Sequence, residues 1–247
     1  MILSFLVALV AIWMMPSMAV AVKDRKFGGR TSYHGKAVNW AVWYAMQAAM
    51  KMLATPHFGG ERDWVLMWQG CWSRSVGASA GTHGGTGTFD ISLFNWKNRL
   101  WVFRLLGFAI WMRPAIRGLW VQHMHGVMAG DGGAARLAIQ QVASFWKRPS
   151  RDGLRGNRVD KQLPKMLCRP LFVYPLKEAG RPGKLKCVTS CHAYKQQTTQ
   201  APRYGDQINV GDILEVVAIT RDRDTGKYWG VTATGRCIYR DNFTRAS

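Results

Sequence analysis

The chain has few acidic residues and few cysteines. Fourteen Asp and Glu stand against 34 Lys and Arg, which gives a net charge of +20. A chain this basic is attracted to polyanions, such as nucleic acid, anionic lipid or an acidic cell wall. Five cysteines are an odd number and too few for a small protein built on disulfides. The composition also excludes a collagen, a coiled coil and a polytopic membrane protein.

The sequence does contain enough apolar material for a folded core. Hydrophobic residues make up 48% of the 247 positions. This length suits one large domain, or one medium domain with a small one.

The N-terminal segment is the one long apolar run. Residues 1–15 contain a single polar side chain, Ser4, and Pro16 follows them. Small residues at Ala19 and Ala21 have the spacing of a signal-peptidase site, although no Lys or Arg precedes the apolar run. Residues 1–22 are therefore expected to be a signal peptide, or alternatively an uncleaved membrane anchor or the product of a mistaken start codon. Either of the first two makes the protein secreted or associated with the cell envelope.

Apolar periodicity predicts an α+β domain over residues 30–150 with a small antiparallel sheet. Helical spacing and strand-like runs divide this region between them. Helices are expected at 36–54, 97–106 and 134–147, and strands at 64–68, 108–112 and 120–128.

The remainder of the chain differs in composition. Residues 151–185 are rich in basic residues and proline, which is typical of a linker that either stays solvated or contacts an anionic polymer. Residues 186–247 alternate short β-type runs with turns, and strands are expected at 213–219, 228–231 and 237–239. The segments beginning at Gly211 (Gly-Asp-Ile-Leu-Glu-Val), Lys227 (Lys-Tyr-Trp-Gly-Val) and Gly235 (Gly-Arg-Cys-Ile-Tyr) resemble a bacterial Src-homology-3-like wall-binding β-barrel.

Two short motifs carry candidate metal ligands. His83 lies in a Gly-rich turn, and Asp90 follows seven positions later at the start of a strand. His123 and His125 are two positions apart, so that on a strand their side chains share a face. Nitrogen and oxygen ligands suit zinc, and catalytic zinc sites use three protein ligands.

These motifs, with Gln69-Gly70, Trp111-x-Arg113-Pro114 and the segment 151–157 (Arg-Asp-Gly-Leu-Arg-Gly-Asn), resemble a family of actinobacterial and phage cell-wall proteins. That family is similar to the D-Ala-D-Ala metallopeptidases, whose fold the Hedgehog signalling domain shares. The resemblance implies a zinc site formed by His83, Asp90 and His125, and a general-base Glu three residues before the last His.

The sequence departs from this pattern at the position of the general base. Residue 122 is Gln, and an amide can hydrogen-bond to water but cannot take its proton. Gln122 and His123 are therefore the candidate catalytic residues, with His123 either relaying a proton or competing for the metal. Gln69, Arg113 and Trp120 are candidate substrate-binding residues, although core packing or surface charge also accounts for each of them.

These expectations lead to two functions. The first is a zinc-dependent peptidoglycan hydrolase acting on stem peptides, held to the anionic wall by its basic linker and barrel. The alternative is a catalytically impaired, zinc-containing wall-binding module. No specific nucleic-acid partner is expected, because the basic residues form no recognised nucleic-acid-binding motif. Cys187 or Cys191 is a candidate for a disulfide to Cys237, and Cys187, Cys191 and His192 together are candidates for a zinc knuckle.

Overall fold

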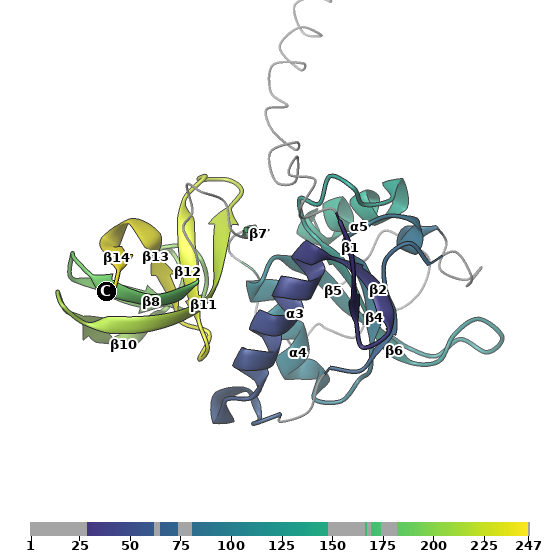
Figure 1. Ribbon diagram of the computed structural model, residues 1–247, viewed down its shortest axis with the longest axis horizontal. Helices are drawn as coiled ribbons and strands as arrows, with labels where there is room; N and C mark the ends of the chain where they lie inside the picture. The colour runs from purple at the N-terminus through teal and green to yellow at the C-terminus, as the bar shows by residue number, and fades with distance from the viewer. Residues whose placement is uncertain are drawn as a thin grey trace, which may run out of the picture.

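The computed structural model describes residues 29–61, 65–73, 81–147, 166, 169–173 and 182–246 (Figure 1). The described chain is a mixed α+β structure with three α-helices and antiparallel sheets. A four-stranded sheet belongs to the first part of the chain and an eight-stranded sheet to the last part.

The four-stranded sheet has the order β3 (Met67–Gln69), β4 (Thr88–Ile91), β6 (His123–Met128) and β5 (Phe108–Arg113). Asp90 on β4 lies opposite His125 on β6, and His125 lies opposite Trp111 on β5. Paired residues on adjacent strands point to the same face. Asp90, His125 and Trp111 therefore share one face of the sheet.

The other face of this sheet carries the main apolar core. Phe89, Ile110 and Met124 are fully buried there against α3 (Trp40–Leu53) and α4 (Trp96–Leu105). Helix α3 buries a stripe with helical spacing, which packs against the sheet and the other core residues. A hairpin of β1 (Arg30–Tyr33) and β2 (Lys36–Asn39) precedes α3.

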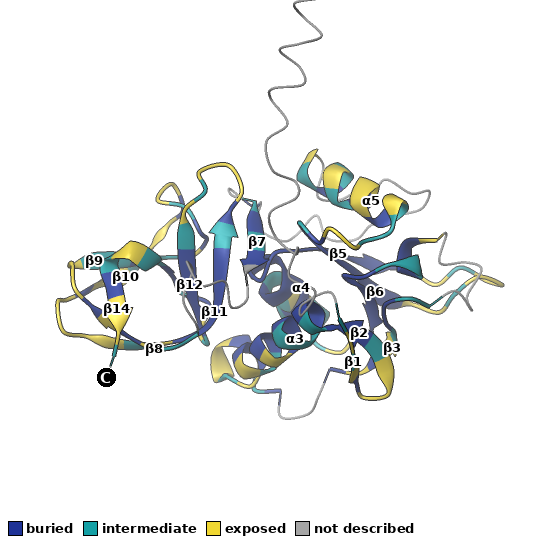
Figure 2. Cartoon of the chain, turned by 45° about the horizontal axis from the view of Figure 1, so that its top comes forward, coloured by how far each residue is buried: buried dark blue, intermediate teal, exposed yellow. Residues whose placement is uncertain are grey.

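The face that carries Asp90 and His125 is covered by α5 (Arg136–Lys147). Ala138, Gln141 and Phe145 are its buried residues, and their spacing places them on one side of the helix. Ala138 and Phe145 pack with Trp111 in a small separate core. The outer side of α5 is exposed in Figure 2.

The eight-stranded sheet is formed by the C-terminal part of the chain. It has the order β10 (Arg203–Ile208), β9 (Cys191–Tyr194), β13 (Cys237–Tyr239), β12 (Tyr228–Thr232), β11 (Ile213–Asp222), β8 (Gly183–Cys187) and β14 (Phe243–Arg245), while β7 (Pro170–Val173) also pairs with β11. Short 3₁₀ turns occur at Pro56–Phe58, Thr82–Gly84 and Arg240–Asn242.

The two parts of the chain share one apolar core. Phe172 and Trp229 of the C-terminal sheet belong to the same buried cluster as the residues of α3 and α4. The buried Gln197 Nε2 donates a hydrogen bond of 2.6 Å to the carbonyl oxygen of Leu105. A Cβ on Gly235 would lie 2.7 Å from the ring of Phe58, so the contact is close enough to require glycine.

Most of the expected elements are confirmed, with shifted boundaries. The helices expected at 36–54, 97–106 and 134–147 correspond to α3, α4 and α5, but residues 36–39 form β2 because they pair with β1. The strand expected at 120–128 begins at His123. Part of the expected linker is folded, since β7 and the start of β8 lie within residues 151–185.

Other expectations fall outside the described residues or find no support in them. The predicted signal peptide or anchor, 1–22, lies outside the described residues. None of the helices in the described ranges is long and apolar enough to cross a membrane. The candidate disulfide is not formed, because neither Cys187 nor Cys191 is bonded to Cys237.

Candidate metal centre

The Gly-rich connection before β4 positions His83. His83 lies in the 3₁₀ turn Thr82–Gly84, and Gly87 closes the connection with φ of 74°. A Cβ on Gly85 would lie 2.4 Å from the carbonyl oxygen of Gly133. The connection therefore packs so closely on the turn before α5 that only glycine fits there.

A buried carboxylate outside the site braces this connection. Asp131 accepts hydrogen bonds from Thr86 Oγ1 at 2.7 Å, Gly133 N at 2.9 Å and Asn39 Nδ2 at 3.0 Å. The Oδ1 atom of Asn39 in turn accepts from Gly87 N. Asp131 thus has a structural role, and its oxygens are occupied by donors.

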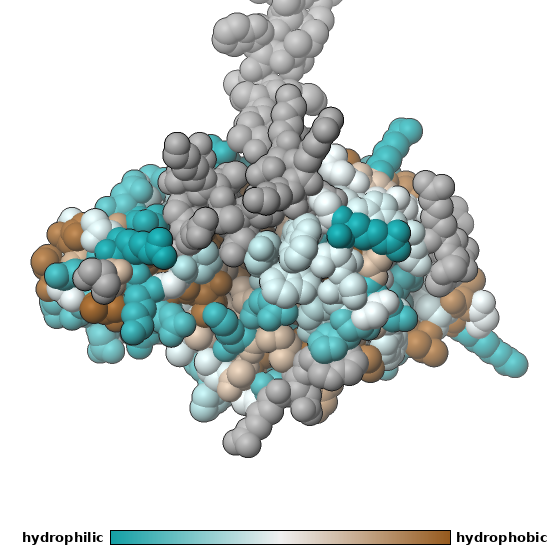
Figure 3. Space-filling view, viewed as in Figure 1, coloured by the Kyte–Doolittle hydropathy of each residue, from teal (hydrophilic) through white to brown (hydrophobic). Residues whose placement is uncertain are grey.

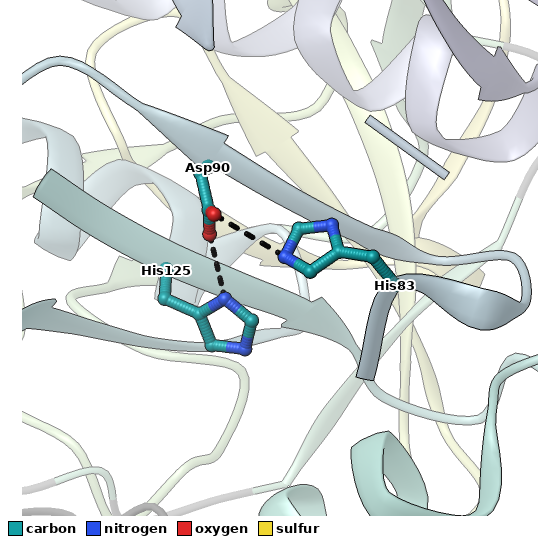
Figure 4. Close-up of side chains that lie close together, drawn as sticks. All are labelled: His83, Asp90 and His125. Atoms are coloured by element: carbon teal, nitrogen blue, oxygen red, sulfur yellow. Dashed lines mark hydrogen bonds and ion pairs between the residues drawn. The ribbon is translucent and has the colours of Figure 1, made fainter. Parts of the chain in front are cut away.

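Three buried side chains converge on one point at the covered face of the sheet (Figure 4). The exposed fraction is 1% for His83, 9% for Asp90 and 0% for His125. His83 Nε2 lies 3.3 Å from Asp90 Oδ2, and His125 Nδ1 lies 2.7 Å from Asp90 Oδ1. The candidate ligand atoms of the three residues all lie within 4.8 Å of one another. Zinc bonds of about 2.0–2.2 Å require ligand atoms at separations of this order.

The second nitrogen of each imidazole also faces an oxygen. His83 Nδ1 lies 2.9 Å from the carbonyl oxygen of Gly70, and His125 Nε2 lies 3.0 Å from Gln141 Oε1. A neutral imidazole has one N–H, and these oxygens only accept. If that hydrogen is donated to Gly70 or Gln141, the remaining lone pair on each ring faces the Asp90 carboxylate. Two lone pairs and a carboxylate around one point form an arrangement that a cation stabilises.

Burial and neighbouring groups together determine the protonation of His125 and Asp90. Burial lowers the pKa of His125 to about 4, and the positive charge of Arg113 acts in the same direction. Burial alone would raise the pKa of Asp90, but the neighbouring His83 and His125 outweigh it and hold that pKa well below its usual range. At neutral pH the centre therefore contains a neutral His125 and an ionised Asp90, the forms that bind a metal ion.

These pKa values predict how the stability of the metal-free protein depends on pH. His125 has an ordinary pKa of 6.5 when unfolded, so between pH 6.5 and pH 4 the unfolded state binds a proton that the folded state does not. The free energy of unfolding should fall by about 3 kcal/mol as the pH is lowered through this window. Denaturant titrations with chelator present measure the free energy of unfolding of the wild type and of His125→Asn at each pH. If this free energy depends on pH equally in the two proteins, the pH dependence does not come from His125.

The structure brings His123 to the edge of the centre. Its Nδ1 lies 2.7 Å from the carbonyl oxygen of Val121, to which it donates, and its Nε2 lies 3.8 Å from Asp90 Oδ1. His123 is 5% exposed, and its Nε2 has no hydrogen-bond partner in the described part of the chain. The prediction that His123 and His125 share a face is confirmed.

Gln122 lies away from the three converging residues. Its side chain is exposed, and its Nε2 lies 3.9 Å from Met112 Sδ. Met112 is paired with Met124, which belongs to the core on the other face of the sheet. The alternation of side chains along a strand accounts for this, because an odd separation from His125 leads to the opposite face.

Two of the candidate substrate-binding residues, Arg113 and Trp120, lie beside His123. The Arg113 guanidinium lies 5.7 Å from the centre of the Trp120 ring, and that ring lies 6.2 Å from the His123 ring. The Trp120 Nε1 donates to the carbonyl oxygen of Pro114, which ties together the base of the β5–β6 connection. Gln69 is paired with Asp90 on the adjacent strand.

Three residues at the centre were missed by the sequence predictions. The carbonyl of Gly70 and the amide of Gln141 fix the two histidines, and the Trp68 ring lies 6.4 Å from that of His123. The sequence contained a signal for Gln141, which is a polar residue in the apolar stripe formed with Ala138 and Phe145. Met67 pairs with the core residue Ile91, so strand alternation places Trp68 on the face of the site. The register irregularity that brings Gln69 opposite Asp90 was not visible in the sequence.

His83, Asp90 and His125 form the only group of three or more potential metal-binding side chains found in the described ranges. The candidate knuckle at Cys187, Cys191 and His192 is not such a group there. Cys71, close to the Gly-rich connection, remains a thiol because burial raises its pKa to about 11.

Comparisons with protein-family models, with curated proteins and with solved structures find no match for this chain.

Proposed function

We propose that the protein is a zinc-dependent peptidoglycan hydrolase that cleaves peptide bonds in stem peptides. The convergence of His83, Asp90 and His125 carries this proposal. It also rests on the resemblance of their motifs to the D-Ala-D-Ala metallopeptidases, whose fold we propose for the first part of the chain. We further propose that residues 186–247 act as a Src-homology-3-like wall-binding module and that the protein is secreted or held at the cell envelope.

The donor set fits zinc. Two imidazole nitrogens and one carboxylate oxygen are the ligands of many catalytic zinc sites, which leave a further position open. An ion bound there would polarise a peptide carbonyl and lower the pKa of water. His83, Asp90 and His125 would hold the ion, and the lone pair of His123 Nε2 is placed to accept a proton beside them.

The surroundings of the centre suit a peptide substrate. Trp68 is 37% exposed beside His123, and Leu119 and Val121 are exposed on the connection between β5 and β6. Figure 3 shows apolar surface at the end of the molecule where this connection projects in Figure 1. We propose that Arg113 and Gln69 bind the polar groups of the peptide while Trp120 lines the site. The net charge of +20 favours the anionic wall as the location of the substrate.

Digestion of purified peptidoglycan tests this function. The zinc-loaded wild type should release new amino termini, whereas chelator treatment or His83→Ala should lower the rate at least 10³-fold, because the metal centre is lost. His57→Ala is the control, since His57 is exposed and lies outside the centre. Intact peptide bonds after incubation with the zinc-loaded wild type would refute the hydrolase function.

A second function is favoured by the position of Gln122. The proton-accepting Glu implied by the family resemblance is replaced by an amide that contacts Met112. This supports a zinc-containing wall-binding module with impaired catalysis. Zinc binding and turnover, measured together on the wild type, distinguish the two functions: zinc bound with hydrolysis favours the hydrolase, and zinc bound without hydrolysis favours the impaired module.

A further inference from the structure

We infer that Gln141 on α5 is a positioning residue of the metal centre, which determines the nitrogen that His125 presents to the ion. The inference rests on the proposed metal site and adds a fourth residue, and a helix, to it. Gln141 does not itself point a ligand atom at the ion, because its oxygen faces the far side of the His125 ring.

The contact geometry defines the role. Gln141 Oε1 lies 3.0 Å from His125 Nε2, and both residues are 0% exposed. Because an amide oxygen only accepts, the hydrogen of His125 is held on Nε2. The lone pair on Nδ1 is then directed toward Asp90 and the ion. Gly70 does the same for His83, but from the backbone, so Gln141 is the only side chain that holds either imidazole in this way among the described residues.

Packing alone gives no reason for an amide at this position. Gln141 lies between Ala138 and Phe145 on the buried side of α5, where an apolar residue would fill the space. Its Nε2 is buried and has no hydrogen-bond partner in the described part of the chain. A buried polar atom without a partner destabilises a fold, so residues of this kind are retained mainly where they serve a site.

Removing the acceptor would have different effects on the fold and on the metal site. In metal-free Gln141→Leu, His125 can carry its hydrogen on Nδ1 and donate it to Asp90 Oδ1, 2.7 Å away. The metal-free fold should therefore be as stable as that of the wild type. Zinc binding would then have to return the hydrogen to Nε2, where it is buried without an acceptor. Losing such an outer partner typically weakens metal binding 10–100-fold.

Zinc titrations against a chromophoric chelator, with the full-length chain, test the inference. Gln141→Leu should lower the zinc affinity about 10–100-fold while its metal-free denaturation midpoint stays at or above that of the wild type. Gln141→Glu keeps an acceptor oxygen and should bind zinc within a few-fold of the wild type. Gln140→Leu is the matched control, because Gln140 is exposed on the same helix.

Each outcome separates the inference from the metal site itself. If the wild type binds zinc and Gln141→Leu binds it equally well, the inference is wrong and the site remains. If Gln141→Leu loses zinc affinity and metal-free stability together, Gln141 has only a structural role. If Gln141→Leu does not fold, Gln141→Glu provides the test. A fall in its zinc affinity as large as that in His125→Asn also overturns the inference. If the wild type binds no zinc, the metal site fails and the inference fails with it.

Discussion

Saturating zinc should raise the thermal midpoint of the wild-type protein by about 10 °C, and Asp90→Asn should abolish this shift. A ligand at a thousand times its dissociation constant stabilises the folded state by about 4 kcal/mol. Each kcal/mol corresponds to about 2–4 °C for a chain of this size. Asp90 supplies the one charged ligand of the three, and an amide oxygen is a much weaker ligand for zinc.

Without metal, Asp90→Asn should not destabilise the protein. The Asn side chain has nearly the same shape as Asp, and its amide can donate to a lone pair of His83 or His125 that the carboxylate only repels. We therefore expect the metal-free variant to melt at or above the midpoint of the metal-free wild type. A scanning-calorimetry series with chelator and with zinc measures both effects.

Asp131→Asn provides the matched control. Asp131 is also buried, at 5% exposed, but its oxygens accept hydrogen bonds from Thr86, Gly133 and Asn39. An amide nitrogen there would face donors, so this variant should lose stability. Zinc should still raise its thermal midpoint by most of the amount seen in the wild type. If zinc raises the thermal midpoint of Asp90→Asn as much as that of the wild type, the proposed ligand set is contradicted.

Replacing His123 with Phe should lower peptidoglycan turnover by about 10²–10⁴-fold and change the zinc affinity by only a few-fold. The Nε2 lone pair of His123 lies beside the centre at 3.8 Å from Asp90 Oδ1, without a hydrogen-bond partner in the described ranges. The loss of a general base typically costs this much in rate. Phe keeps the ring that packs near Trp68 and Trp120.

Parallel measurements of turnover and zinc affinity separate the possible roles of His123. A loss of zinc binding in His123→Phe would identify His123 as a ligand, which was the competing role predicted from the sequence. Turnover equal to that of the wild type would show that His123 moves no proton. His192→Phe on the C-terminal sheet serves as the control for replacing a histidine ring elsewhere.

Local spacing indicated the candidate ligands, and the family resemblance implied which three of them form the centre of the site. His83 and Asp90 are joined by one short Gly-rich connection, and strand alternation places His123 and His125 on one face. The same alternation places Gln122 on the other face once the strand is known to include it or border it. These relations depend only on neighbouring residues, so a sequence contains them.

Contacts between distant segments could not be predicted in the same way. The acceptor oxygen of Gln141 reaches His125 because α5 docks on the sheet, and the Gly70 carbonyl reaches His83 because β3 pairs with β4. The folding of Pro170–Val173 as β7 depends likewise on its pairing with β11, whereas the surrounding range 151–185 has the basic, proline-containing composition that is typical of a linker. Docking and pairing of this kind are set by the whole core, not by local propensity.

A crystal of the zinc-loaded protein, with an anomalous difference map at the zinc edge, tests the central claim most directly. One peak per chain should lie about 2.0–2.2 Å from His83 Nε2, an Asp90 carboxylate oxygen and His125 Nδ1. The peak should be missing in Asp90→Asn. A map with no peak between these atoms, or with the zinc held by other side chains, would contradict the metal centre and the hydrolase built on it.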